Sequence, residues 1–371
     1  MIGKSVLAIA IGMVVGQPAV GWAAEPDWAA IADRIVEKLE VRPGESFAAI
    51  VNPAVHEQLV PHLRRAVASA GGTDVGPIDA SSQPDRRALR DIDATVMLPG
   101  AVPGMPVYAA IQDLLRERVG RNIHFHWLSN GSAFTVPDGN LPSNEIIEAT
   151  YERAVLAVDY EAMAAGQRAF EAAMRGVEIH VTSPAGTDLR FRIGDRPVSL
   201  QNGDASAKRV SSAPILIDRE LELPAGAVRV APIESSVEGF IAFPPSEWNG
   251  VRVEGLRMRF EDGRVVEISA DRGRDAVVTE LDAAGAAGRA FREFALGFNP
   301  LLAIPDEAPW IPYYGYGSGV VRLSLGDNSE LGGEVGGGWV RWNFFVDTTV
   351  AVDGETWVRS GKLVHPTSAG K

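Results

Sequence analysis

The spacing of apolar residues changes once along this chain, near residue 177, and this change constrains the fold more than any other feature. Before it, predicted helices alternate with short apolar runs such as residues 47–51. The first helix is expected over residues 27–41, with Pro26 and Asp27 as its start signal. One face of that helix carries its apolar residues: Trp28, Ile31, Ile35 and Leu39. Alternation of helix and buried strand is typical of a parallel α/β layer.

After residue 177 the apolar period becomes two, as in residues 177–181 and 189–193. Asp262-Gly263 and Asp353-Gly354 each predict a hairpin turn. Further strands are expected near residues 251–255, 256–260, 265–268, 320–325 and 340–350, with one helix over 274–294. The sequence therefore predicts an α/β N-terminal domain over residues 24–195 and a β-rich α+β C-terminal domain over residues 196–371.

The first residues have the pattern of a secretory signal peptide, which we place at residues 1–23. Lys4 supplies the one charge, residues 6–15 are apolar, and Gly21 and Ala23 stand where cleavage requires small residues. The alternative is an uncleaved N-terminal anchor. We expect a periplasmic or secreted protein, with no membrane contact once the leader is removed, since the remaining sequence has no run of eighteen apolar residues.

Charge and cysteine content exclude several classes of function. The formal net charge of −13 at pH 7 repels phosphate backbones, so we expect no nucleic-acid partner. The sequence contains no cysteine, which rules out thiolate zinc sites, iron–sulfur clusters and cysteine nucleophiles.

Five segments, taken in order, resemble the aminopeptidase T family of metallopeptidases. They are residues 185–189 (Ala-Gly-Thr-Asp-Leu), 223–232 (Leu-Pro-Ala-Gly-Ala-Val-Arg-Val-Ala-Pro), 292–300 (Arg-Glu-Phe-Ala-Leu-Gly-Phe-Asn-Pro), 320–328 (Val-Val-Arg-Leu-Ser-Leu-Gly-Asp-Asn) and 339–345 (Trp-Val-Arg-Trp-Asn-Phe-Phe). The resemblance implies an aminopeptidase T-like two-domain architecture. It also implies descent from metal-dependent aminopeptidases and a homodimer.

The family's two metal ions are held by two glutamates, two histidines and an aspartate. In this chain the corresponding positions are Ala227, Glu293, Arg322, Arg341 and Asn343. Glu293, expected at the end of the predicted helix, is the one position that keeps a metal-binding group. Arginine has no lone pair for a cation, and each guanidinium would repel a nearby divalent ion by several kcal/mol at an effective dielectric constant of about 20. We therefore expect neither a metal nor another cofactor at this site.

Shifting the alignment by a few residues does not restore the missing metal ligands. Glu234 and Glu238 are the nearby replacements for the lost glutamate, and no histidine lies between His180 and His365. Imidazole ligands are therefore not recovered locally.

Two interpretations of the rewritten positions stay open. Arg341 and Asn343 stand two apart on a predicted strand and so face one side, with Arg322 on a neighbouring strand. Together with Glu293 they form either an anion pocket or an internal salt bridge. Two arginines against one carboxylate leave a surplus of positive charge, which favours a ligand or a further acid.

The predicted function is that of a secreted aminopeptidase T-like protein that has lost its metal-dependent peptidase site. It would bind a small carboxylate-bearing ligand, such as an amino acid or peptide, through Arg322, Arg341, Asn343 and Glu293. One alternative is a metal-independent enzyme with Glu293 as base and the arginines as anion stabilisers. The other is a residual aminopeptidase with displaced ligands.

Two further motifs, one of histidines and one of tyrosines, are candidate parts of a functional site. His124 and His126 would share a strand face, but their spacing suggests no third metal ligand, so a structural pair is favoured. Residues 313–316 carry three tyrosines that either line a pocket mouth or pack as a loop, and packing is favoured.

Overall fold

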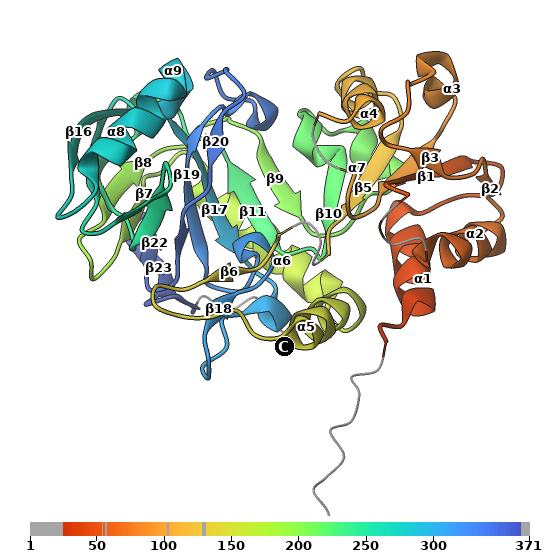
Figure 1. Ribbon diagram of the computed structural model, residues 1–371, viewed down its shortest axis with the longest axis horizontal. Coiled ribbons are helices and arrows are strands. Elements are labelled where there is room, and N and C mark those ends of the chain that lie inside the picture. Colours follow the sequence, from red (N-terminus) through yellow and green to blue (C-terminus); the bar gives the residue numbers. More distant parts are fainter. Residues whose placement is uncertain (1–24, 54, 56–57, 102–103, 128–130, 365–371) are drawn as a thin grey trace, which may run out of the picture.

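The computed structural model describes residues 25–53, 55, 58–101, 104–127 and 131–364, and the predicted leader at residues 1–23 lies outside these ranges. Figure 1 shows an α/β portion beside a β-rich portion, as the change of apolar period predicts.

The N-terminal portion is built on a parallel sheet. Its elements in chain order are α1 (Trp28–Leu39), β1 (Ser46–Val51), α2 (Leu59–Ser69), β2 (Thr73–Asp74), β3 (Ile78–Asp79), α3 (Arg86–Arg90), β4 (Ala94–Met97), α4 (Pro106–Arg116), β5 (Arg121–Phe125), β6 (Phe134–Thr135), α5 (Asn144–Leu156) and α6 (Tyr160–Met174). Helix α1 begins as expected, because the Asp27 side chain accepts a hydrogen bond from the amide of Ala30 at 2.9 Å.

The rest of the chain is mostly strands. The elements are β7 (Ile179–Thr182), β8 (Asp188–Phe191), β9 (Val198–Gln201), α7 (Ala207–Ser211), η2 (Leu216–Asp218), β10 (Glu220–Leu223), β11 (Ala227–Val230), η3 (Glu234–Ser236), β12 (Glu238–Ala242), β13 (Ser246–Trp248), β14 (Val251–Val253), β15 (Arg257–Glu261), β16 (Arg264–Ser269), α8 (Arg274–Ala283), α9 (Gly285–Gly288), β17 (Phe291–Gly297), η4 (Pro300–Leu302), β18 (Trp310–Ile311), η5 (Tyr313–Gly315), β19 (Val321–Gly326), η6 (Ser329–Leu331), β20 (Val340–Arg341), β21 (Phe344–Phe345), β22 (Thr349–Val352), β23 (Glu355–Arg359) and β24 (Lys362–Leu363).

Three large sheets organise these strands. The first is parallel, in the order β10-β5-β4-β1-β2 with β3 beside β1. The second is antiparallel, in the order β20-β19-β17-β11-β9 with β21 also beside β19. The third runs β16-β15-β12-β8-β7-β22-β23-β24 and contains both predicted hairpins, β15–β16 and β22–β23.

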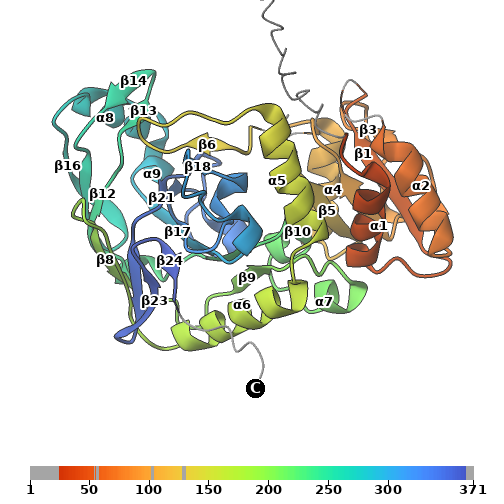
Figure 2. The same ribbon diagram turned by 90° about the horizontal axis from the view of Figure 1, so that it is seen from below.

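The sheets exchange strands across the predicted boundary at residue 195. Strand β10 follows that boundary, yet it joins the N-terminal sheet beside β5. Strands β7 and β8 precede it, yet they lie in the third sheet. Helix α5 also contacts both α1 and η4, and Figure 2 shows it between the two portions. The division at residue 195 therefore stays a prediction.

Two expected elements are wrong. The helix predicted over 274–294 ends at Ala283, apart from the short turn of α9, and Glu293 lies inside strand β17 instead of at a helix end. The strand predicted over 340–350 is broken into β20, β21 and the start of β22. Both corrections bear on the candidate site.

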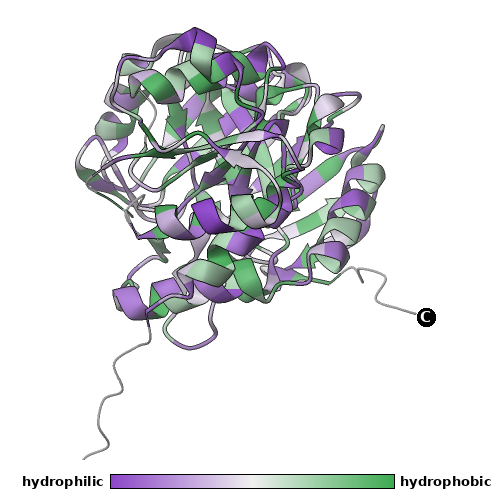
Figure 3. Cartoon of the chain, turned by 90° about the vertical axis from the view of Figure 1, so that its right-hand side faces the viewer, coloured by the Kyte–Doolittle hydropathy of each residue, from purple (hydrophilic) through white to green (hydrophobic). Residues whose placement is uncertain are grey.

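One apolar core extends through both portions, from Trp28 on α1 to Val358 on β23. Figure 3 shows hydrophobic residues along the strands and both hydrophobic and hydrophilic stripes on the outer helices. Such continuous packing holds the parallel sheet and the second sheet in a fixed relation. None of the helices in the described residues is long and apolar enough to cross a membrane.

Candidate functional site

The candidate site is built around a single buried carboxylate on the second sheet. Antiparallel pairing places Glu293 of β17 opposite Ser324 of β19, while Arg229 of β11 stands opposite Ala295. Arg322 of β19 is also paired with Ala295. The side chain of Glu293 is 0% exposed, so its charge must be balanced by protein groups.

Arginines supply that balance. Arg229 donates to one oxygen of Glu293 through Nε and Nη2, both at 3.0 Å. The other oxygen lies 3.0 Å from Nε of Arg322, 3.9 Å from Nε of Arg292, and accepts a hydrogen bond from Ser324 at 3.1 Å. Burial alone would raise the pKa of Glu293, but the charges of Arg229, Arg322 and Arg292 outweigh burial and hold the pKa well below its ordinary value.

Two further glutamates join this cluster. Glu330 of η6 lies 3.3 Å from Arg229 and also pairs with Arg292. Glu222 of β10 lies 3.8 Å from Arg229. Three arginines thus face three glutamates, and the expected surplus of positive charge is largely neutralised by the further acids.

The predicted contact residues separate into two groups. Arg322 lies with Glu293, as expected. Arg341 and Asn343 share a face, with Arg341 Nε 3.3 Å from the Asn343 side-chain oxygen, but that face lines a different cavity. The residue between them, Trp342, lines both this cavity and the one that contains Arg322.

Arg341 is held by structural contacts in that other cavity. It pairs with Glu280 of α8 at 2.7 Å, donates to the carbonyl of Glu247 at 2.7 Å, and stacks over the ring of Trp248 at 3.5 Å. Asn343 donates to the carbonyl of Leu323 at 3.1 Å. These contacts attach β20 and β21 to neighbouring elements. Arg341 and Asn343 therefore do not pair with Glu293.

A cleft of about 460 Å³ opens between the parallel sheet and the second sheet. Its floor includes Arg229 and Arg322 from the second sheet. The opposite wall comes from β5, β10 and α4 of the parallel sheet. That wall contributes Tyr108, Gln112, His124, His126, Glu220 and Glu222. The carboxyl ends of parallel strands are the usual place for a ligand in such sheets.

The two histidines that sequence reasoning treated as structural line this cleft. Their rings stack with centroids 3.8 Å apart, which confirms that they share a face. His124 Nδ1 lies 3.3 Å from Glu220, and His124 Nε2 and His126 Nδ1 are buried without a hydrogen-bond partner among the described residues. Burial, followed by the neighbouring His124, holds the pKa of His126 well below its ordinary value, so His126 is neutral at pH 7.

Aromatic rings form the mouth of the cleft. Trp342 is 41% exposed and meets the ring of Tyr314 edge-on at 5.3 Å. The guanidinium of Arg322 lies 5.4 Å from the Trp342 ring centroid. Tyr313 and Tyr316 are packed in the core, so of the three tyrosines in this loop Tyr314 alone reaches the cleft.

Sequence reasoning missed Arg229, Arg292, Glu222 and Glu330. A signal for Arg229 was present, because it follows Ala227 by two residues on one strand and so shares its face. A charged residue within an otherwise apolar strand needs a buried partner. Glu222 joins through β10, whose place beside β5 depends on pairing between segments about a hundred residues apart.

The mapped positions do not fit the family's pair of metal ions. Glu293 is fully engaged by arginines and Ser324, and the remaining mapped positions offer an alanine, two guanidiniums and one amide. The proposed replacements lie elsewhere: Glu234 pairs with Arg196, and Glu238 is exposed. Within the described part of the chain, no three His, Asp or Glu side chains are grouped to hold a metal ion.

Comparison with known proteins finds that part of the chain is similar to metallopeptidases. Residues 160–302 match the family described as thermophilic metalloprotease (M29). That segment includes Ala227, Arg229 and Glu293 and ends before Arg322. Aminopeptidase PepS of Streptococcus thermophilus is 30% identical over 132 residues, which are 35% of this chain and 28% of PepS, so the match spans about a quarter of that relative.

Two solved structures share the fold. The 2,5-dihydroxypyridine dioxygenase of Pseudomonas putida covers 91% of this chain and 97% of its own, with a TM-score of 0.63 and 16% identity. Wild-type AmpT of Thermus thermophilus covers 91% and 99%, with a TM-score of 0.57 and 19% identity. The expected architecture is confirmed, and because one of these two structures is named a dioxygenase, the shared fold alone does not determine a reaction.

Proposed function

We propose that this aminopeptidase T-like family member has lost the metal-dependent peptidase reaction and binds a small carboxylate-bearing ligand, such as an amino acid or short peptide, in the cleft between its sheets. One observation carries the proposal: buried Glu293 holds Arg229 and Arg322 at 3.0 Å each. Both oxygens of this carboxylate face guanidinium cations, and Ser324 donates to one of them, so the carboxylate is poorly placed to hold a divalent ion.

The donor side of the proposed site is Arg322. Its Nε lies 3.0 Å from Glu293 as an ion pair, and its Nη1 donates to the carbonyl of Tyr314 at 3.2 Å. Its Nε and Nη2 are both buried without a hydrogen-bond partner among the described residues. Leaving a buried donor unsatisfied costs about 1–3 kcal/mol. A ligand carboxylate would remove that cost and form a charge-assisted hydrogen bond.

The acceptor side comes from the parallel sheet. Glu222 has one buried oxygen without a hydrogen-bond partner among the described residues, and Glu220 sits beside His124. Carboxylates across from a guanidinium suit a ligand that carries an ammonium group as well as a carboxylate. The exposed indole of Trp342 at the mouth adds an apolar face for the ligand's side chain.

The metal-independent enzyme is the weaker alternative. A general base works best when its pKa lies near the operating pH. Burial and the three arginines instead leave Glu293 with a pKa well below its ordinary value, and every side of the carboxylate is already occupied. Glu293 is therefore suited to holding arginines and poorly suited to accepting a proton.

The experiment is a calorimetric titration of chelator-treated protein with a panel of amino acids and dipeptides. Arg322→Lys keeps the charge beside Glu293 but removes the guanidinium fork, so the affinity for the best ligand should fall roughly tenfold or more. Arg341→Ala is the matched control, because Arg341 lines the other cavity. The affinity of this variant for the same ligand should differ from that of the wild-type protein by less than about twofold.

Either of two results would reject this function. One is a panel in which no amino acid or dipeptide binds. The other is an equal loss of affinity in Arg322→Lys and Arg341→Ala, with both variants folded by circular dichroism. The proposed periplasmic or secreted location depends on the leader at residues 1–23 alone, and N-terminal sequencing of the mature protein tests it.

A further inference from the structure

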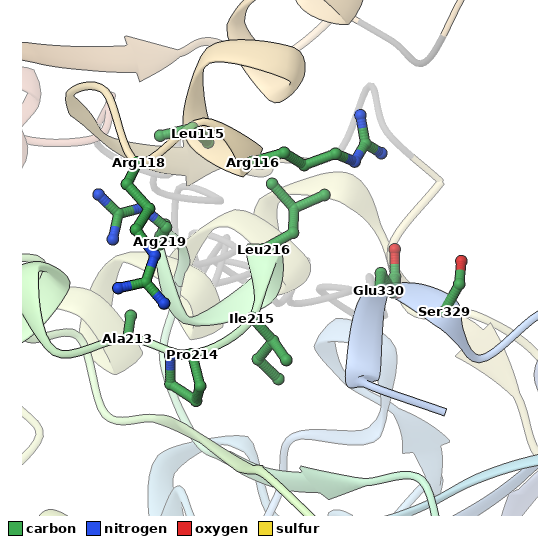
Figure 4. Close-up of a pocket in the computed structure, with 10 residues that line it drawn as sticks. All are labelled: Leu115, Arg116, Arg118, Ala213, Pro214, Ile215, Leu216, Arg219, Ser329 and Glu330. Carbon is green, nitrogen blue, oxygen red and sulfur yellow. The ribbon is translucent and has the colours of Figure 1, made fainter. Parts of the chain in front are cut away.

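A second cavity, of about 310 Å³, lies where the end of α4 faces the segment before β10 (Figure 4). It is rich in arginine and poor in acid. Its lining is Leu115, Arg116, Arg118, Ala213, Pro214, Ile215, Leu216, Arg219, Ser329 and Glu330. We call it the Arg118–Arg219 pocket.

Arg219 is unusual among the buried arginines. It is 5% exposed, and its Nη1 donates to the carbonyl of Val210 at 2.6 Å. Its Nε is buried without a partner, and no carboxylate pairs with it among the described residues. Every other buried arginine in the described part of the chain has a carboxylate partner: Arg121 with Glu45, Arg229 and Arg322 with Glu293, and Arg292 with Glu330.

The neighbour of Arg219 in this pocket is a second cation. Figure 4 shows the guanidiniums of Arg118 and Arg219 together on one side of the pocket, while Arg116 extends to the other side. Burial and then the charge of Arg118 lower the pKa of Arg219. Arg118 also has no carboxylate partner among the described residues, whereas Arg116 pairs with Asp113 at 3.0 Å.

The backbone of Arg118 has a conformation that is unfavourable for an arginine. Arg118 follows the C-cap of α4 with a φ of 64°, the left-handed conformation that favours glycine. A side chain with a Cβ is strained in that conformation. The chain therefore keeps a strained arginine beside a buried, unneutralised one.

We infer that the Arg118–Arg219 pocket binds a small oxyanion, a phosphate or a carboxylate, between its two guanidiniums. Guanidinium forks match the oxygens of both groups, and a bridging anion would turn the repulsion between two cations into two charge-assisted hydrogen bonds. The one carboxylate in the lining, Glu330, lies across the pocket and is already held by Arg229 and Arg292. Because Leu216 and Glu330 line both cavities, this oxyanion would sit next to the cleft.

Arg118→Gly gives a sharp test, because it removes the guanidinium and also relieves the left-handed backbone. We expect the affinity for inorganic phosphate or for succinate, measured by calorimetry, to fall at least tenfold, while the melting temperature stays level or rises. Arg64→Ala is the matched control, because this exposed arginine of α2 pairs with Asp74 and does not line the pocket, and it should change either affinity less than twofold. Stronger binding of phosphate would identify a phosphate-bearing ligand, and stronger binding of succinate a carboxylate.

Three outcomes would overturn the inference. The first is that neither phosphate nor succinate binds saturably to the wild-type protein. The second is an equal loss of affinity in Arg64→Ala and Arg118→Gly, which would indicate general attraction to basic side chains. The third is binding that persists in Arg118→Gly and disappears in Arg322→Lys, which would place the anion in the cleft. This test does not depend on the function proposed for the cleft.

Discussion

Replacing Glu293 with glutamine is expected to lower the free energy of unfolding by about 3–5 kcal/mol. The carboxylate is fully buried and pairs with Arg229 and Arg322 at 3.0 Å each. Glutamine keeps the shape of the side chain but removes its negative charge. Arg229 and Arg322 then remain buried with too little negative charge beside them. Urea unfolding at pH 7 measures the loss.

The control and the pH dependence make this prediction specific. Glu267→Gln removes an exposed partner of Arg259 and should cost less than about 1 kcal/mol. The pKa of Glu293 is depressed by folding, so its contribution is present above its ordinary value of 4.5 and is lost as the pH falls below it. Because glutamine does not titrate, the free energy of unfolding of the Glu293→Gln variant should fall less at acid pH than that of the wild-type protein. A cost below 1 kcal/mol, or an unchanged acid profile, would contradict the account.

Replacing Gly297 with alanine is expected to cost about 3 kcal/mol, because there is no space for a methyl group at the end of β17. An added Cβ would stand 2.0 Å from the carbonyl oxygen of Gly317 and 2.7 Å from the carbonyl carbon of Tyr316. Both are backbone atoms, so relief requires moving the loop that leads into β19. Thermal or urea unfolding measures the loss.

Gly336→Ala is the matched control, since nothing lies within 4 Å of the corresponding Cβ and the residue is exposed. Its effect should stay within about 0.5 kcal/mol. Equal stability of the two variants would show that Gly297 is not tightly packed.

The nearby Asn299 has a related structural role, because its buried side chain donates to the carbonyl of Ala225 at 2.8 Å. Gly297 and Asn299, both in the family-like segment 292–300, therefore stabilise the fold and need no metal ion to do so.

Sequence reasoning worked where one face of an element is buried. Alternating residues predicted β7, β8 and β15, and Asp-Gly pairs predicted the two hairpins. It failed for β17, because every residue of that strand is buried and no alternation remains to distinguish a strand from a helix. The strand expected over 340–350 was wrong because its residues form short separate pairings with β19, β7 and β23.

The candidate site was less predictable because its contacts are long-range. The surviving Glu293 and the replaced Arg322 were found from the sequence, and the structure brings them together. The hydrogen-bonded partners of Arg229, Glu293 and Glu330, lie 64 and 101 residues away, and Arg341 pairs with Glu280 at a separation of 61 residues. Sequence spacing placed Arg341 and Asn343 on one face, but only the register of β19 against β20 and β21 determines where that face points.

The most direct test of the account is metal analysis after dialysis. Purified protein would be equilibrated with zinc, cobalt or manganese at pH 7, dialysed against metal-free buffer, and its bound metal measured per chain. We predict a content far below one ion per chain, because Arg229 and Arg322 occupy the coordination sites of Glu293. One or two tightly bound ions per chain, lost in the Glu293→Gln variant, would contradict the central claim that guanidinium groups have replaced the metals.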